Sequence, residues 1–311
     1  MHSTQYKRYL FGLPICAADI ESTVETLFPN SNPVLFSSAR AGLSGVLQLL
    51  GITRPDIVWC PPYSSHCVLD SIGRFGTPST TGIVDAKAAL IYHQWGFVHT
   101  HEVRGVRTII EDAVDTFFLP GVSPFACDGR FVLWSLPKVI ATTWGGVVFS
   151  RDSNDAEDLR EIRDGRRKFQ GFQAFLRMAA DHSVMAGRYW HGNESMNGGL
   201  PDFALRQIQE SLATIPAKAK RRERILDIIR SNGIGFRMTN GRLPSNIPVK
   251  PSVGANKWWG SECVFSAGLR SINLAHDYSK DVWGRVIPLP VNQDISESLL
   301  QQLPLHQFEG A

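Results

Sequence analysis

Three groups of polar residues follow apolar runs of the kind that form buried strands. Asp112 comes after TIIE, Lys138 after RFVLWSLP, and Ser38, Ala39 and Arg40 lie between VLF and a glycine-containing helical segment. In an open α/β sheet the ligand binds at the carboxyl ends of the strands, so a site is expected where these residues stand. Taken singly, each has a structural explanation: a helix N-cap, a surface lysine and a tight strand-to-helix turn.

Together, a lysine, a carboxylate and the start of a helix supply what pyridoxal 5'-phosphate requires. The lysine amine bonds to the aldehyde carbon of the cofactor, and the carboxylate keeps the pyridine nitrogen protonated so that the ring withdraws electrons. Backbone N–H groups at a helix start bind the phosphate. The sequence therefore predicts Lys138 and Asp112 as catalytic residues, with Ala39 and Arg40 at the phosphate.

The elements that must position these residues alternate between apolar, β-rich runs and helical or turn segments from about residue 34 to 150. This alternation predicts βαβ units around a mostly parallel sheet, and strands that are apolar throughout indicate a sheet covered on both faces. The runs that we expect to form strands are VLF, DIVWC, GIVD, ALIYH, RTIIED, RFVLWS and GGVVFS.

The rest of the chain changes character twice. From about residue 155 to 231 the pattern is helical and charged, with Pro216 as a break or a kink. A Gly/Pro-rich stretch, RVIPLPV and the helical run ISESLLQQL follow, and they indicate a small α+β domain. We expect a large domain over residues 1–231 and a small one over residues 232–311. A basic cluster in the helical part is interpreted as a solvated helix face: Lys218, Lys220, Arg221, Arg222 and Arg224.

The composition excludes several classes of protein. The chain has 311 residues, 43% of them apolar, and a formal net charge of +3, which is far from the dense basic patch of a nucleic-acid-binding protein. Its 5 cysteines are scattered without a CxxC pair, so neither a disulfide framework nor a zinc ribbon is expected. No apolar run approaches the roughly 20 residues of a membrane helix. We expect a cytoplasmic protein with neither nucleic-acid nor membrane partners.

Several motifs, in one order over most of the chain, resemble the DegT/DnrJ/StrS-type sugar aminotransferases, which are pyridoxal-phosphate enzymes of fold type I. SARAGL is similar to the phosphate turn of that family, IYHQWG to its VHLYG stretch, and IPLPVNQDIS to the segment before its last helix. IIEDAVDTF resembles the ED-A motif and puts Asp112 at the pyridine nitrogen, whereas SLPK with a later glycine pair makes Lys138 the cofactor lysine. GNESM places Asn193 where the family has an asparagine that reaches the cofactor of the neighbouring subunit.

The chain departs from the family pattern at two positions around the cofactor ring. PPYSSHCVLDSI matches the segment that carries the family's ring-stacking aromatic, but Ser65 stands at that position. The stacking contact is therefore missing or is supplied by His66 or Tyr63. Asp115 replaces the usual Gln or His near the phenolic oxygen of the cofactor, where its charge opposes an oxyanion unless Arg40 offsets it.

Two further departures concern the phosphate and the partner subunit. The family's serine five positions before the lysine is Leu133 here, and Ser135, three positions before Lys138, is expected to bond the phosphate instead. Ser195 stands where the family has an arginine. These differences make the substrate less predictable from the resemblance than the cofactor.

The resemblance implies a fold type I α/β domain, with a mostly parallel sheet flanked by helices, and a small C-terminal α+β domain. It also implies a homodimer, in which Asn193 comes from the partner, and the transfer of an amino group from glutamate or glutamine to a keto sugar nucleotide. Two alternatives use the same scaffold. One is a degenerate member that binds pyridoxal phosphate or a sugar nucleotide without transamination, and the other is a sugar dehydratase-like enzyme.

A histidine-rich stretch offers an alternative of another class, a metal-dependent hydrolase. His99 and His101 share a face if this stretch is a strand, which is one way to build a metal site. However, the family pattern accounts for His93, and no distant ligands are evident, so we expect no metal. The whole cluster comprises His93, His99, His101 and Glu102.

Overall fold

The computed structural model describes residues 14–99, 103, 105–166, 196–251, 270–273, 283–292, 295, 297–302, 305 and 308–310. The chain forms two units. The first comprises Met1–Tyr92, Val103–Val114 and Ser123–Ala213, and the second comprises His93–Glu102, Asp115–Val122 and Thr214–Ala311. The division into domains of residues 1–231 and 232–311 stays a prediction. In the part of the chain that the structure describes, no helix has the length and apolar character needed to cross a membrane.

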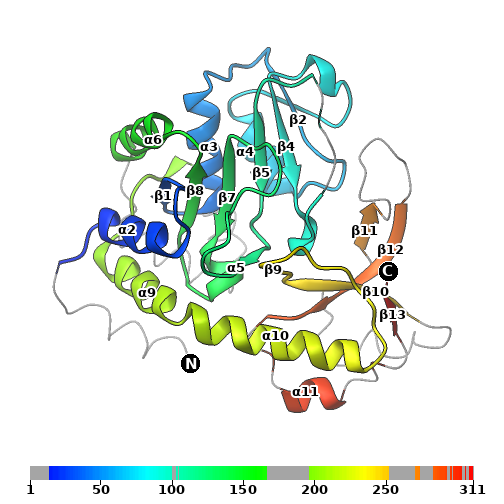
Figure 1. Cartoon of the computed structure of the whole chain (residues 1–311). Coiled ribbons are helices and arrows are strands. Elements are labelled where there is room, and N and C mark those ends of the chain that lie inside the picture. The colour runs from blue at the N-terminus through cyan, green and yellow to red at the C-terminus, as the bar shows by residue number, and fades with distance from the viewer. Residues whose placement is uncertain are drawn as a thin grey trace, which may run out of the picture. The chain divides into compact units, whose positions relative to one another are not determined.

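One seven-stranded sheet forms the centre of the first unit, in the order β1-β8-β7-β5-β4-β2-β3 (Figure 1). Strand β8 runs antiparallel to both of its neighbours, and the other neighbouring strands are parallel. The predicted mostly parallel sheet is thereby confirmed. The strands are β1 (Pro33–Phe36), β2 (Ile57–Trp59), β3 (Thr77–Ser79), β4 (Ala88–Tyr92), β5 (Ile109–Asp112), β7 (Phe131–Ser135) and β8 (Gly146–Ser150).

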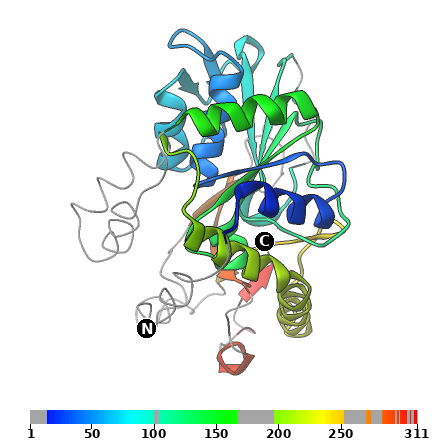
Figure 2. The same cartoon turned by 90° about the vertical axis from the view of Figure 1, so that its left-hand side faces the viewer.

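Helices cover both faces of this sheet, as its apolar strands require (Figures 1 and 2). Leu133 of β7 packs in a core cluster with residues of α3, whereas the next residue, Trp134, meets the ring of Phe28 beside α2 edge-on at 5.6 Å. Successive side chains of a strand point to opposite faces, so α3 and α2 lie on opposite sides. The helices are α2 (Ala17–Leu27), α3 (Ala39–Leu49), α4 (His66–Gly73), α5 (Leu136–Ile140), α6 (Ser153–Gly165) and α9 (Asp202–Ala213).

The run GIVD is not a strand, so that prediction is wrong. Ile83–Asp85 form the 3-10 helix η1, and Gly82 in front of it has a left-handed backbone with φ 66°. A turn that starts at a positive φ cannot continue an extended strand. The strand parallel to β2 at the sheet edge is instead the short β3.

The second unit has a four-stranded antiparallel sheet in the order β11-β12-β10-β13, and a separate pair of β6 and β9. Helix α10 begins next to Pro216, which confirms the predicted break before it, and α11 confirms the predicted terminal helix. The elements are η2 (Gln94–Gly96), β6 (Phe117–Phe118), α10 (Ile215–Ser231), β9 (Arg242–Leu243), β10 (Asn246–Pro251), β11 (Arg270–Asn273), β12 (Trp283–Pro290), α11 (Glu297–Gln302) and β13 (Phe308–Gly310).

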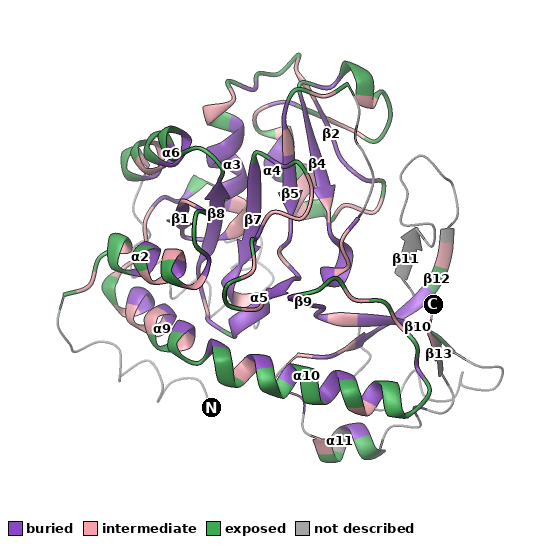
Figure 3. Cartoon of the chain, in the orientation of Figure 1, coloured by how far each residue is buried: buried purple, intermediate pink, exposed green. Residues whose placement is uncertain are grey.

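Arg222 contradicts the interpretation of the basic cluster as a wholly solvated face. Its side chain is fully buried, with the guanidinium 4.8 Å from the centroid of the Phe117 ring and one N–H donated to the Pro244 carbonyl at 3.3 Å. The reason is the helical period, because Ala219 and Ile225, three residues before and after it, are also buried. Figure 3 shows this alternation of buried and exposed positions along α10.

Candidate active site

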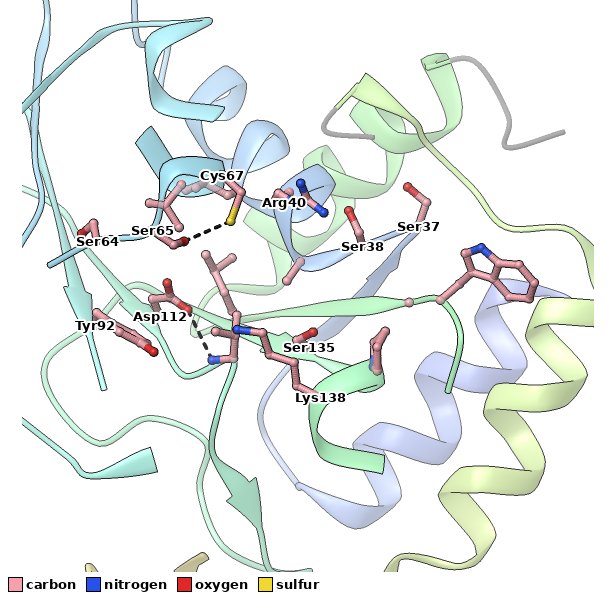
Figure 4. Close-up of a pocket in the computed structure, with 18 of the residues that line it drawn as sticks. Ser37, Ser38, Arg40, Ser64, Ser65, Cys67, Tyr92, Asp112, Ser135 and Lys138 are labelled. Atoms are coloured by element: carbon pink, nitrogen blue, oxygen red, sulfur yellow. Dashed lines mark hydrogen bonds between the residues drawn. The ribbon is translucent and has the colours of Figure 1, made fainter. Parts of the chain in front are cut away.

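A cavity of about 370 Å³ lies at the carboxyl ends of the strands of the first unit, a size typical of small-molecule sites (Figure 4). Tyr92 ends β4, Asp112 ends β5 and Ser135 ends β7, and all three line the cavity. The connections that follow the strands supply the rest of the wall. The cavity therefore occupies the sheet edge at which the sequence predicted a site.

The start of α3 forms one wall and has the features of an anion site. Ser38 caps the helix, since its hydroxyl oxygen accepts a hydrogen bond from the Ala41 N–H at 3.1 Å. Ser38, Ala39 and Arg40 all line the cavity. The N–H groups at a helix start carry the positive end of the helix dipole, and the Arg40 guanidinium adds a full charge. This wall is suited to a phosphate.

A pair of glycines lets β8 come close to that helix start. The Gly145 N–H donates to the Ser37 carbonyl at 2.9 Å, and Gly145 has a left-handed backbone with φ 104°. A Cβ atom on Gly146 would lie only 2.1 Å from the Ala39 nitrogen. Any larger residue at position 146 would push the α3 start away from its place in the wall.

Asp112 is the carboxylate of the cavity, and its neighbour Glu111 is not. The Asp112 side chain is 3% exposed, and one of its oxygens accepts a hydrogen bond from the Val114 N–H at 3.3 Å. Glu111 points to the opposite face of the strand, where its oxygens accept from the backbone N–H groups of Ala126, Cys127 and Gly129 at 2.9 to 3.1 Å. Strand alternation thus assigns one carboxylate to the site and the other to the packing of a loop.

Lys138 reaches the cavity from α5, the short helix directly after β7. Pro137 fits the first turn of that helix, where its missing N–H costs no hydrogen bond. Ser135 precedes the helix and is 9% exposed, whereas Lys138 itself is exposed. Figure 4 shows the Lys138 side chain extended into the cavity on the side where Asp112 lies.

The wall formed by the start of α4 carries small side chains in place of an aromatic ring. Ser65 and Cys67 line the cavity, with their oxygen and sulfur atoms 3.0 Å apart. His66 is exposed and is not among the lining residues. The Tyr63 ring is not among them either; it packs against the Tyr92 ring at a centroid distance of 6.0 Å. Neither of the two expected substitutes for the stacking aromatic therefore lines this cavity.

The structure gathers most of the predicted site residues around one space, and two of the described ones do not line it. Those that line the cavity are Ala39, Arg40, Ser65, Asp112, Ser135 and Lys138. His66 is exposed and does not line the cavity, and Asp115 belongs to the second unit, where it is buried. Asn193 lies outside the described residues, as do Ser195, His101 and Glu102. Their roles stay predictions.

Tyr92 and Cys67 line the cavity and were missed in the sequence. The signal for Tyr92 is the one that identified Asp112, a polar group at the carboxyl end of a buried strand. Cys67 is harder to find, because its place in the wall depends on where α4 begins.

In the histidine stretch, the Nδ1 atom of His93 accepts a hydrogen bond from the His99 backbone N–H at 3.3 Å.

Comparison with known proteins places this chain among cofactor-dependent enzymes. Residues 20–304 match a sequence family described as "Putative PLP-dependent aminotransferase", where PLP is pyridoxal phosphate. No curated protein sequence matches the chain.

Solved structures of sugar aminotransferases and related enzymes have the same fold. A DegT DnrJ EryC1 StrS aminotransferase from Brucella abortus has a TM-score of 0.64 at 14% identity, over 95% of this chain and 91% of that one. The aminotransferase TlmJ from Streptoalloteichus hindustanus has a TM-score of 0.63 at 17% identity, over 96% of this chain and 92% of that one. The sugar aminotransferase CalS13 from Micromonospora echinospora has a TM-score of 0.60 at 17% identity, over 95% of this chain and 93% of that one. At such identities the likeness shows the fold, which is that of fold type I aminotransferases.

Proposed function

Because this chain belongs to the family of PLP-dependent aminotransferases, we propose that the cavity of its first unit binds pyridoxal 5'-phosphate. We further propose that the protein transfers an amino group from glutamate or glutamine to a keto sugar nucleotide. One observation carries this proposal: a lysine, a buried carboxylate and a helix start line the same cavity. The sugar aminotransferase CalS13 among its structural neighbours supports the substrate class.

The residues present fit the cofactor. The cavity of about 370 Å³ is large enough for a substituted pyridine ring. Ser38, Ala39 and Arg40 form a helix start suited to the phosphate, and Gly146 keeps the adjacent strand close to it. Asp112 is an almost fully buried carboxylate, and Lys138 is the amine that lines the same space.

When bound, pyridoxal phosphate supplies a protonated pyridine ring that withdraws electrons from the carbon next to the substrate nitrogen. The Asp112 carboxylate holds a proton at the ring nitrogen, because opposite charges at short range favour both ionised forms. The Lys138 amine moves a proton at the substrate carbon as a general acid and base. Arg40, the Ala39 N–H and the Ser135 hydroxyl bind the phosphate and fix the ring between these two groups.

The proposed active unit is a cytoplasmic homodimer in which Asn193 of one subunit completes the cofactor site of the other. The dimer and the role of Asn193 follow from the family resemblance alone, whereas the cytoplasmic location follows from the scattered cysteines. A mass in solution equal to one chain at micromolar concentration would contradict it, whereas a dimer that dissociates with loss of bound cofactor would support it.

The first experiment is to trap the cofactor. Purified protein is incubated with pyridoxal phosphate and reduced with borohydride, and the modified lysine is mapped by mass spectrometry. We expect the label on Lys138 in the wild-type protein and no label in Lys138→Ala. The control is Lys87→Ala, which should be labelled fully, because the Lys87 amine forms an ion pair with Asp56 at the surface. Wild-type protein without a label on Lys138 would overturn the proposed cofactor site.

The second experiment separates amino transfer from its alternatives. Glutamate and a keto sugar nucleotide are added to the loaded protein, and 2-oxoglutarate and the amino sugar are measured. Release of both supports the proposal. Cofactor binding without either product identifies a degenerate binding protein, which the small side chains of Ser65 and Cys67 favour, and loss of a sugar hydroxyl without nitrogen transfer identifies a dehydratase-like enzyme.

Replacement of Asp112 tests its role at the ring nitrogen. Asp112→Asn keeps the shape of the side chain and removes its charge. We expect the rate of 2-oxoglutarate release to fall by about 10- to 1,000-fold, because an opposite charge at this range shifts a pKa by about 1–3 units. A variant with the wild-type rate would contradict the proposed contact.

A further inference from the structure

Tyr92 lies in the cavity without a role in the proposed function. It ends β4, and its backbone is the direct partner of Asp112 in the parallel pair of β4 and β5. Side chains of partnered residues in a sheet point to the same face, and both residues line the cavity. Figure 4 shows the Tyr92 ring pointing into the cavity on the same side as Asp112. The two groups therefore face a ligand from adjacent strands.

The strand order decides which edge of the ligand Tyr92 faces. Strand β5, which carries Asp112, has β7, β8 and β1 on one side and β4, β2 and β3 on the other. The groups suited to the phosphate belong to the first side, because α3 follows β1 and Ser135 ends β7. Tyr92 lies on the other side of Asp112, as do the cavity residues Ser65 and Cys67, which follow β2. Among these residues, Tyr92 is the one on the strand directly adjacent to Asp112.

The substituents of pyridoxal phosphate match that arrangement. Its phosphate arm and its ring hydroxyl flank the aldehyde carbon on opposite sides, and the ring nitrogen lies across from that carbon. With the nitrogen at Asp112 and the phosphate toward β7 and β1, the 3-oxygen faces β4. On the basis of the proposed function, we infer that the Tyr92 hydroxyl donates a hydrogen bond to the 3-oxygen of the cofactor ring.

The chemistry of a phenol suits this position. A phenol is a hydrogen-bond donor at neutral pH and stabilises an oxyanion, whereas a carboxylate in the same place opposes one. The Tyr63 ring packs against the Tyr92 ring and restricts its orientation. The other charged or titratable groups that face the cavity are Arg40, Cys67, Asp112 and Lys138.

The test is the pH titration of the visible absorption band of the protein loaded with pyridoxal phosphate. In that state the Lys138 nitrogen would hold a proton next to the 3-oxygen, and a hydrogen bond donated by Tyr92 to this oxygen would weaken its hold on that proton. Tyr92→Phe removes the donor and keeps the ring, so we expect the midpoint of the titration to rise by about one to two pH units. Tyr63→Phe is the matched control and should leave the midpoint within about 0.3 units.

A second measurement uses ligand affinity in place of absorption. The wild-type protein should bind the 3-deoxy analogue of pyridoxal phosphate about tenfold more weakly than the cofactor, and Tyr92→Phe should show a smaller difference between the two ligands. If the wild-type protein shows the absorption band, this inference alone is overturned when Tyr92→Phe has the wild-type midpoint, or when Tyr63→Phe shifts the midpoint as much as Tyr92→Phe does. A wild-type protein without any absorption band overturns the proposed function and this inference with it.

Discussion

Gly146 begins β8 and lies against the start of α3, so an added methyl group tests how tightly the phosphate wall is built. In Gly146→Ala the Cβ atom would lie 2.1 Å from the Ala39 nitrogen and 2.4 Å from the Ser38 carbonyl carbon. Both of these are backbone atoms, which cannot move aside as the end of a flexible side chain does. Since ordinary contact begins near 3.4 Å, the β8 and α3 backbones must separate by about 1.3 Å.

This displacement sets the size of two expected effects. Overpacking of a well-packed interior costs about 1–3 kcal/mol, so the free energy of unfolding should fall by that amount. A movement of more than about 1 Å also takes the α3 N–H groups away from the phosphate. Loss of one hydrogen bond to a charged group is worth about 1.5–3 kcal/mol, which corresponds to about a 10- to 100-fold rise in the Kd for pyridoxal phosphate.

Urea denaturation followed by fluorescence gives the first quantity, and titration with pyridoxal phosphate followed by absorbance gives the second. Gly165→Ala is the matched control, because nothing lies within 4 Å of the Cβ position at the end of α6. That control should leave both quantities within about 0.5 kcal/mol of the wild type. Wild-type stability and wild-type affinity in Gly146→Ala would refute the reasoning from the close approach of β8 to α3.

Two further predictions concern the core and the thiols of the first unit. Glu21 is 5% exposed and accepts hydrogen bonds from two arginines of α6, so Glu21→Gln should lower the free energy of unfolding by about 3 kcal/mol. The control Asp70→Asn removes an exposed ion pair and should lower it by less than about 1 kcal/mol. Equal effects of the two substitutions in urea denaturation would contradict this prediction. Burial raises the pKa of the Cys60 thiol, so iodoacetamide at pH 8 should label the cavity residue Cys67 faster than Cys60. Added pyridoxal phosphate should slow the labelling of Cys67 and leave that of Cys60 unchanged. Mass spectrometry of the labelled peptides measures both rates.

Much of the first unit could be predicted from local sequence. The runs ALIY and FVLW are apolar at every position, which is typical of a strand covered on both faces, and the structure has β4 and β7 there. Because parallel strands joined by helices bring their carboxyl ends to one edge, the positions of Asp112 and Lys138 in the chain already placed them at a common edge.

Other features depended on contacts between residues far apart in the chain. A short apolar run such as GIVD is compatible with a strand or a turn, and the left-handed backbone of Gly82 is visible only in the folded chain. Arg222 looks like one more charge of a basic run, and its burial against Phe117 depends on a residue about a hundred positions earlier.

The sequence by itself determined most of the strands and helices along the chain, the family, and the places of Asp112 and Ser135 at the ends of their strands, because these depend on local periodicity and on motifs. The tertiary structure decided which side chains share the cavity. It placed Tyr92 beside Asp112, kept Glu111 for a loop and left His66 outside. The reason is that strand register, strand order and the start of each helix fix the distances between side chains, and all three follow from packing among distant segments.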